Sequence, residues 1–313
     1  MTGIHGKHPT PYVVKDPPSE KLTANVIDSD SPPLVSFVIP CYNDDDVLRE
    51  CLQSIQQQEY PNIETIVVDN GSEDQSLRIA EEFADKILKV DGPLGRVRQK
   101  GIESSMGEII GIFDSDNYLP DSGWLGRAVQ YFNYDESVAN VWPQNVGPKN
   151  SPPLSRVYWG LWEAIIEDRI ENSRGVCGGG TSLFRRSALE EVGGIDQGVH
   201  WGEDFNLAVK LKQAGFSVVY ITDSVYHDTD MGDSILQFAK KQFLGAEAFA
   251  DNSFGAMNLS LSEVVYEQFV VGGRRMVTGL TRDRDPAWIL FPFFILIRAG
   301  VYSYVMLKNK VVK

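Results

Sequence analysis

The sequence predicts an α/β protein built on a doubly wound, mostly parallel β-sheet. Two observations support this class. From residue 34 onward, short apolar runs rich in β-branched residues alternate with amphipathic stretches, and the runs are continuously apolar, as in strands that helices cover on both faces. The chain has 313 residues, 42% of them hydrophobic, which is enough to bury such a sheet. Sheets of this type bind ligands at the carboxyl ends of their strands.

The predicted elements follow one another closely along the chain. We expect strands at 34–39, 63–68, 87–90 and 109–113, with helices at 47–57, 75–83 and 95–105 between them. Mixed elements are expected over 140–225, among them a glycine-rich strand entrance at 177–181 and a helix at 204–214. A last helix is expected at 234–251, before an apolar tail. Residues 1–33 are rich in Pro, Asp and Ser without a helical or strand period, which predicts a flexible extension.

The charge balance argues against a nucleic-acid-binding protein. The formal net charge is −14, whereas binding to a phosphate backbone requires a basic surface. Cys41, Cys51 and Cys177 are odd in number and have no CxxC spacing, so they indicate a reducing compartment rather than a disulfide framework or a zinc site. Residues 1–10 lack the apolar stretch of a cleavable signal peptide, and we expect the main domain to stay in the cytoplasm.

The C-terminal segment differs in character from the rest of the chain. Residues 287–307 are apolar at most positions, and residues 274–313 contain eight Lys or Arg against two acidic residues. A segment of this length can span a bilayer, lie in or re-enter its surface, or form a buried core element. Arg298 near its middle and Pro292 favour the interfacial or re-entrant anchor. We expect this anchor to hold the protein at the cytoplasmic face of the cell membrane, where basic residues meet anionic lipid.

Two carboxylates follow the fourth predicted strand. Asp114 and Asp116, separated by Ser115, would be presented from the strand end into the ligand-binding crevice. Carboxylate oxygens at this spacing suit Mg²⁺ or Mn²⁺ carrying a diphosphate, since the cation bridges carboxylate and phosphate oxygens. The alternative is an Asp-rich turn that caps the following helix.

The other polar candidates can be interpreted as functional or as structural residues. Asp69 would bind a base or ribose, or would close an Asx turn and cap the next helix. Asp44 and its two acidic successors fit the positive end of a helix dipole, and we interpret them as structural. In the pair Glu203-Asp204, a carboxylate at a helix N-terminus would act as general base or as a cap. His227 would be a ligand or an ordinary buried or surface histidine.

Five segments, taken in order, resemble the motifs of family-2 glycosyltransferases with a GT-A fold. They are VSFVIPCYN (35–43), VVDNGSED (67–74), GRVRQKGIESSMGEIIGIFDSDN (95–117), GGGTSLFRRSALEEVGGID (178–196) and GEDFNLAVKLKQAG (202–215). The resemblance covers residues 34–228, and five ordered motifs at compatible spacing are more specific than any one of them. It implies a GT-A catalytic domain over 34–228 and a C-terminal helical region over 229–313 with its membrane anchor at 287–307.

The resemblance also implies roles for individual residues. Asp114 and Asp116 would form the DxD element, with Asp116 favoured as the direct metal ligand and His227 reaching the same metal. Asp204 would be the catalytic base of the ED motif. The residues implied in nucleotide-sugar binding are Pro40, Tyr42, Asn43, Asp69, Arg98, Asp114, Ser115 and Asp116. Those implied in binding the acceptor or the donor sugar are Gly179, Gly180, Trp201 and Glu203.

The implied reaction is a single inverting transfer from a nucleotide-sugar donor. Processive members of the family carry a Q-x-x-R-W element, whereas residues 237–241 read QFAKK, which favours transfer of one sugar. The basic apolar tail favours a lipid-linked acceptor, with a growing glycan as the other choice. Two rivals are a sugar-nucleotide pyrophosphorylase, whose glycine-rich phosphate loop does not follow the first strand here, and a non-catalytic membrane scaffold of the same fold. The sugar, the nucleotide, the acceptor and the oligomeric state stay open at this point.

Overall fold

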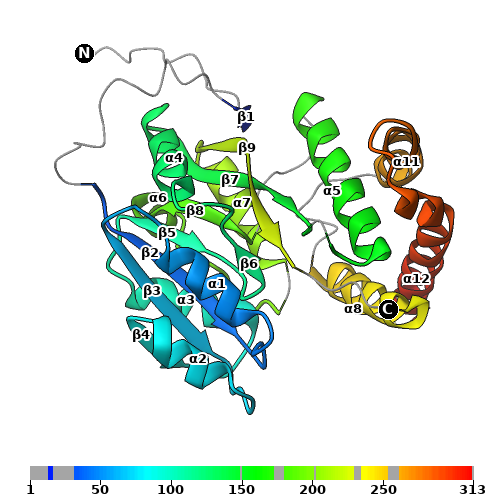
Figure 1. The fold of residues 1–313 in the computed structure, drawn as a ribbon. Helices are drawn as coiled ribbons and strands as arrows, with labels where there is room; N and C mark the ends of the chain where they lie inside the picture. Colours follow the sequence, from blue (N-terminus) through cyan, green and yellow to red (C-terminus); the bar gives the residue numbers. More distant parts are fainter. Residues whose placement is uncertain are drawn as a thin grey trace.

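A computed structural model describes residues 13–16, 32–148, 150–172, 180–200, 202–228, 234–252 and 261–311. Figure 1 shows two parts, an α/β body around a central sheet and a group of helices at its side. Helix α5 (Pro153–Glu171) lies between them, and its side chains pack in hydrophobic clusters with both parts.

The sheet is mixed but mostly parallel. Its strands are β1 (Val13–Lys15), β2 (Val35–Cys41), β3 (Ile63–Asp69), β4 (Lys86–Lys89), β5 (Ile109–Ile112), β6 (Asn117–Tyr118), β7 (Val138–Val146), β8 (Ser182–Arg185) and β9 (Ser217–His227). The strand order is β1-β9-β7-β8-β5-β2-β3-β4, and β6 pairs with β9. Strand β8 is antiparallel to β5 and β7, and β6 is antiparallel to β9, while the other pairs are parallel. The doubly wound, mostly parallel sheet predicted from the sequence is therefore confirmed.

Helices cover both faces of the sheet because side chains of a buried strand alternate between two cores. In β2, Phe37 and Ile39 belong to one core, whereas Val38 between them belongs to the other. The first core is closed by α1 (Leu48–Gln56), α2 (Ser76–Phe83) and α4 (Trp124–Gln130), which a 3₁₀ turn (Tyr131–Asn133) extends. The second core is closed by α3 (Leu94–Ser104), α6 (Arg186–Glu191) and α7 (Glu203–Gln213).

The helices at the side have a hydrophobic cluster of their own. They are α8 (Ile235–Asn252), α10 (Leu261–Val265), a π-helical segment (Tyr266–Val271), α11 (Gly272–Thr281), a 3₁₀ segment (Pro286–Leu290) and α12 (Phe291–Val311). Their cluster includes Phe238, Trp288 and Phe294, and helix α5 contributes Leu161 to it. Since α5 precedes residue 229, the helical cluster draws on chain from both sides of the predicted domain boundary. Within the described residues, one helical stretch, Pro286–Val305, has the length and composition to cross a membrane.

Two of the elements that the sequence did not predict are β1 and α5. No strand was expected before residue 34, yet β1 pairs in parallel with the edge strand β9. Three residues are too few to give a period, and β1 is held by its surroundings: Thr222 donates its backbone N–H to Asp16 at 2.7 Å, and Lys15 pairs with Glu167 at 2.8 Å. The second element is α5, which lies in a stretch where the sequence predicted only mixed elements. Of the 1–33 extension, the structure describes only residues 13–16 and 32 onward.

Packing of α3 on the sheet makes a testable prediction about Gly101. A Cβ atom at this position would lie 2.2 Å from Cγ1 of Val38 and 3.0 Å from Cγ2 of Val68. Gly101→Ala should therefore lower the free energy of unfolding by about 1–3 kcal/mol through overpacking. The matched control is Gly126→Ala in α4, where a Cβ meets nothing within 4 Å and helix propensity should add up to about 1 kcal/mol. Chemical denaturation of both variants measures the difference, and equal effects would contradict the packing.

Candidate active site

The chemistry-bearing residues meet at one edge of the sheet because their strands run the same way. Strands β2, β3 and β5 are mutually parallel, and β9 has the same direction as β5 because it is parallel to β7 and both β7 and β5 are antiparallel to β8. Their carboxyl ends therefore lie at a common edge, as expected for a ligand site in such sheets. Asp69 ends β3 and His227 ends β9, while Asp114 follows shortly after β5.

Hydrogen bonds fix the Asp114–Asp116 loop after β5. The backbone N–H of Asp114 donates to Oδ1 of Asn117 at 2.8 Å, and the hydroxyl of Thr181 donates to the same oxygen at 2.6 Å. Asn117 pairs with His227 across the β6–β9 ladder, and the N–H of Asp228 donates to the carbonyl of Asp116 at 2.9 Å. The loop and the end of β9 are thus tied together through the backbone.

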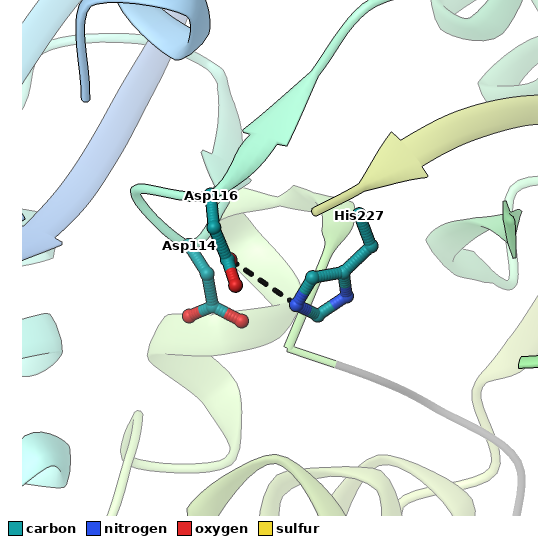
Figure 2. A group of neighbouring side chains, drawn as sticks. All are labelled: Asp114, Asp116 and His227. Atoms are coloured by element: carbon teal, nitrogen blue, oxygen red, sulfur yellow. Dashed lines mark ion pairs between the residues drawn. The ribbon is translucent and has the colours of Figure 1, made fainter. Parts of the chain in front are cut away.

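This backbone arrangement gathers a possible metal-binding group. Asp114, Asp116 and His227 each offer a ligand atom within 4.8 Å of the others. Figure 2 shows their side chains turned toward one another, with Nε2 of His227 3.1 Å from Oδ1 of Asp116. Burial lowers the pKa of His227, but the negative charge and hydrogen bond of Asp116 outweigh it, so the pKa lies above its ordinary value. Imidazole and carboxylates that converge in this way are ligand types used for divalent cations.

Arg98 lies buried between the DxD and ED motifs. Its Nη2 donates to Oδ1 of Asp114 and its Nη1 donates to Oε1 of Glu203, and the residue as a whole is only 3% exposed. The two carboxylates raise the pKa of Arg98 against the opposing effect of burial, so the guanidinium stays charged. The sequence had implied that Arg98 contacts the nucleotide. In the structure, both terminal nitrogens are already engaged with carboxylates.

Asp204 lies in the first turn of helix α7, which begins at Glu203 after Gly202 in a left-handed conformation with φ of 80°. The backbone N–H of Phe205 donates to its Oδ1 at 2.8 Å. Burial raises the pKa of Asp204, the adjacent charge of Glu203 raises it further, and Arg98 acts in the opposite direction, which together give a pKa of about 7. A carboxyl group with a pKa near neutrality is suited to accept a proton from a substrate hydroxyl.

Asp69 is engaged with its own loop. It is 2% exposed and accepts the N–H groups of Gly71 and Ser72 at 3.2 and 3.1 Å, the hydrogen bonds of the Asx-turn reading. Asn43 has φ of 54° and accepts the N–H of Glu73 at 2.8 Å. These contacts build a second polar group at the ends of β2 and β3, and binding of a base or ribose there remains a prediction.

The remaining predicted residues occupy different positions. Pro40 is buried within β2, paired with Val68, whereas Tyr42 is 59% exposed at the edge of the site. Ser115 donates its hydroxyl to Asp44 at 2.8 Å. A Cβ on Gly180 would lie 3.0 Å from Nη2 of Arg98, so this backbone packs directly on the ion pair. Gly179 and Trp201, predicted to bind acceptor or donor sugar, lie outside the described residues, as does Cys177.

Comparisons with known proteins identify the family. Residues 36–193 match the family model described as glycosyl transferase family 2, and residues 173–299 match the model described as glycosyl transferase family group 2. The chain belongs to glycosyl transferase family 2. This membership argues against the alternative hypothesis that the chain is a sugar-nucleotide pyrophosphorylase.

Relatives in this family match the chain over part of their length. Glycosyltransferase AglE of Haloferax volcanii is 29% identical over 205 residues, which cover 62% of this chain and 66% of AglE. The putative glycosyltransferase EpsH of Bacillus subtilis is 45% identical over 96 residues, 28% of either chain. These two alignments thus span between about a quarter and two thirds of the relatives.

Solved structures show the same fold at low sequence identity. The mannosyltransferase PcManGT of Pyrobaculum calidifontis, in complex with GDP-Man and Mn²⁺, has a TM-score of 0.61 at 18% identity and covers 94% of this chain and 93% of its own. S. aureus TarS 1–349 in complex with UDP-GlcNAc has a TM-score of 0.51 at 16% identity, with 90% and 92% covered. The GT-A-type fold predicted from the sequence is confirmed by these likenesses.

Two residues near the site were not identified from the sequence as functional candidates. Trp159 of α5 packs its ring on His227, with ring centroids 4.5 Å apart, and the sequence prediction missed it together with its helix. Asp44 was interpreted as helix N-terminal charge, but its carboxylate accepts from Ser115 inside the DxD element. Burial and the nearby charge of Asp116 raise its pKa, although hydrogen bonds from Tyr42 and Ser115 oppose them. The pairing of a strand-end Asp with the DxD serine depends on three-dimensional proximity, for which a single sequence carries no signal.

The raised pKa of Asp204 predicts a pH-dependent stability difference. A carboxyl group with a pKa near 7 when folded and 3.8 when unfolded stabilises the protein below about pH 4, and this contribution is lost as pH rises toward 7. In the metal-free protein, Asp204→Asn should therefore be more stable than wild type at pH 8, by about 1–2 kcal/mol after allowance for partial exposure. The gain should vanish near pH 4. Denaturant unfolding at the two pH values measures it.

The control for this experiment is Asp121→Asn. The pKa of Asp121 is lowered, mainly by its hydrogen bonds from Arg127, so its neutralisation should bring no gain at pH 8. A variant Asp204→Asn that is no more stable than wild type at pH 8 would contradict the burial and charge environment assigned to Asp204.

Proposed function

We propose that the protein transfers one sugar from a nucleoside-diphosphate sugar to a hydroxyl or phosphate oxygen of an acceptor, with inversion at the anomeric carbon and with a divalent cation. The observation that carries this proposal is the meeting of the Asp114–Asp116–His227 group and Asp204 at one sheet edge. Membership in glycosyl transferase family 2 supports it, as do nucleotide-sugar complexes of proteins with the same fold.

The residues present fit a divalent cation. Two carboxylates and one imidazole place their ligand atoms within 4.8 Å of one another, at the sheet edge where the parallel strands end. Oxygen ligands suit Mg²⁺ or Mn²⁺, and the imidazole favours Mn²⁺ of the two. Because Oδ1 of Asp114 is engaged by Arg98, we assign the main holding role to Asp116 and His227. When bound, the cation would offset the negative charge that develops on the departing diphosphate.

The chain's own residues would carry the proton transfer. Asp204 would accept the proton of the acceptor group as its oxygen forms a bond to the anomeric carbon, while the bond from that carbon to the diphosphate oxygen breaks on the opposite face. One displacement of this kind needs one base and no nucleophile from the protein. The neighbouring Glu203 is held by Arg98, which leaves Asp204 as the carboxylate assigned to this task.

Metal dependence can be tested with the nucleotide alone. Calorimetry should find that GDP or UDP binds wild-type protein with Mn²⁺ and at least about tenfold more weakly with EDTA, since cation bridging supplies part of the affinity. Asp116→Asn should lose this Mn²⁺ effect and about two to three orders of magnitude in turnover. Glu81→Gln, on an exposed carboxylate of α2, is the matched control. Equal nucleotide affinity with and without EDTA would rule out the metal role, and a wild-type protein that neither transfers nor hydrolyses any donor would favour the non-catalytic scaffold.

We further propose that the helical part rests on the cytoplasmic face of the membrane and receives a lipid-linked acceptor there. Among the described residues, exposed large apolar side chains concentrate in this part, with Tyr42 and Met106 as the exceptions elsewhere. The group comprises Ile235, Leu236, Val265, Phe269, Val270, Val277, Leu280, Ile289, Phe293, Leu296 and Tyr304. Arg274, Arg282 and Arg284 are exposed near them, which suits an anionic surface.

The packing of α12 favours an orientation in the plane of the membrane. Its Phe291, Phe294 and Ile295 are buried against the neighbouring helices, whereas Phe293 and Leu296 on the other side are 62% and 68% exposed. Arg298 is satisfied inside the helical part, because it donates to Gln242 of α8 at 2.7 Å. A helix packed along one side and apolar along the other suits an interfacial anchor better than a lone span.

Flotation with anionic liposomes tests this surface. Phe293→Asp with Leu296→Asp should lower partition onto vesicles by about tenfold or more, because burying each side chain contributes about 1.5–3 kcal/mol when complete. The fold should persist since both residues are exposed. Met106→Asp, 72% exposed on the α/β body, is the control that should float like wild type. A wild-type protein that stays soluble with such vesicles and is fully active on a water-soluble acceptor would contradict the anchoring proposal.

A further inference from the structure

The guanidinium of Arg98 links the two acidic motifs of the site. Asp114 lies two residues before Asp116, and Glu203 directly precedes Asp204. Each carboxylate that Arg98 holds is therefore the near neighbour of a carboxylate assigned to the chemistry. The two ion pairs join the loop after β5 to the first turn of α7, which are distant in sequence.

The surroundings of Arg98 leave it little freedom to serve a ligand. Its side chain is 4% exposed and that of Glu203 is 2% exposed. The backbone of Gly180 packs on the guanidinium of Arg98, since a Cβ at Gly180 would lie 3.0 Å from Nη2 of Arg98 and 3.4 Å from Oδ2 of Asp114. Contact with a nucleotide would require the guanidinium to leave the buried carboxylate of Glu203 and the partly exposed carboxylate of Asp114, and a buried charge is costly to leave without a partner.

We propose that Arg98 is a positioning residue that sets the separate roles of the paired acids. It holds Asp114 and Glu203, so that Asp116 is left to hold the cation with His227 and Asp204 is left as the base. This assignment rests on the proposed function, and it replaces the nucleotide contact that the sequence had implied for Arg98.

The electrostatics of the site require such a group. Asp114, Asp116, Glu203 and Asp204 bring four carboxylates together, and like charges at short range repel one another where the side chains are partly or fully buried. Arg98 interacts with three of them, Asp114, Glu203 and Asp204. A planar fork with two terminal nitrogens can hold two carboxylates in fixed directions, whereas a lysine ammonium is a single point charge on a flexible stem.

The difference between arginine and lysine provides the test. Arg98→Lys keeps the charge and loses the fork, so kcat should fall about a hundredfold from misplacement of Asp204 relative to the acceptor. The KM for the donor and the calorimetric affinity for GDP or UDP with Mn²⁺ should stay within about threefold of wild type. Arg96→Lys is the matched control, because Arg96 lies exposed on the same helix and should retain wild-type kinetics.

Glu203→Gln tests the other end of the bridge and serves alone if Arg98→Lys does not fold. It should also lower kcat with little change in KM, and the double variant should be no worse than the poorer single variant, because both act through one contact. Retained kcat with tenfold weaker nucleotide binding in Arg98→Lys would identify Arg98 as a nucleotide ligand. Additive losses of kcat in the double variant would show that Arg98 and Glu203 do not act through one shared contact. Either result in an active wild type overturns this assignment alone, whereas a wild type without turnover overturns the proposed function with it.

Discussion

The site depends on burying negative charge at one sheet edge without separating it from a counter-charge. Parallel strands bring their carboxyl ends together, so acids that follow different strands accumulate there. Arg98 makes this accumulation tolerable, because it pairs with the buried carboxylate of Glu203 and with the partly exposed carboxylate of Asp114. Breaking a buried pair such as Arg98–Glu203 by removing one partner typically costs about 3–5 kcal/mol, which ties the stability of the site to its geometry. The pKa of Asp204 stays raised because of its burial and, after that, the adjacent charge of Glu203, which the charge of Arg98 only partly offsets.

Much of the α/β body was predictable because each element carries its own local signal. The continuous apolar runs that became β2, β3 and β5 and the amphipathic α1, α2 and α3 match the predicted spans to within one or two residues. Helix α5 was missed because it packs against both the sheet and the C-terminal helices, and this leaves its apolar residues without a single clear face. Strand β1 was missed because its pairing with β9 is a tertiary contact.

The sequence motifs identified the acids of the site but not their relations. The motifs that contain Asp114, Asp116 and Asp204 predict a catalytic centre. Only the fold reveals that Arg98 donates hydrogen bonds to Asp114 and to Glu203, the residue before Asp204. Helix α5 extends this centre toward the helical part. Its Trp159 packs on His227. The adjacent Tyr158 lies below the guanidinium of Arg298 in α12, with Cζ of Arg298 6.0 Å from the Tyr158 ring centroid. One helix thus contacts both the proposed metal group and the proposed membrane-facing helix.

The central claim is that Asp204 acts as the base of a single displacement, with Glu203 withheld by Arg98. Its most direct test is the anomeric configuration of the product, read from the proton NMR coupling constant of the transferred sugar in the first turnovers with a donor of known configuration. The account predicts the configuration opposite to that of the donor, because the acceptor attacks the face away from the diphosphate. Product with the donor's own configuration would mean that the transfer proceeds by another route, and it would contradict the account.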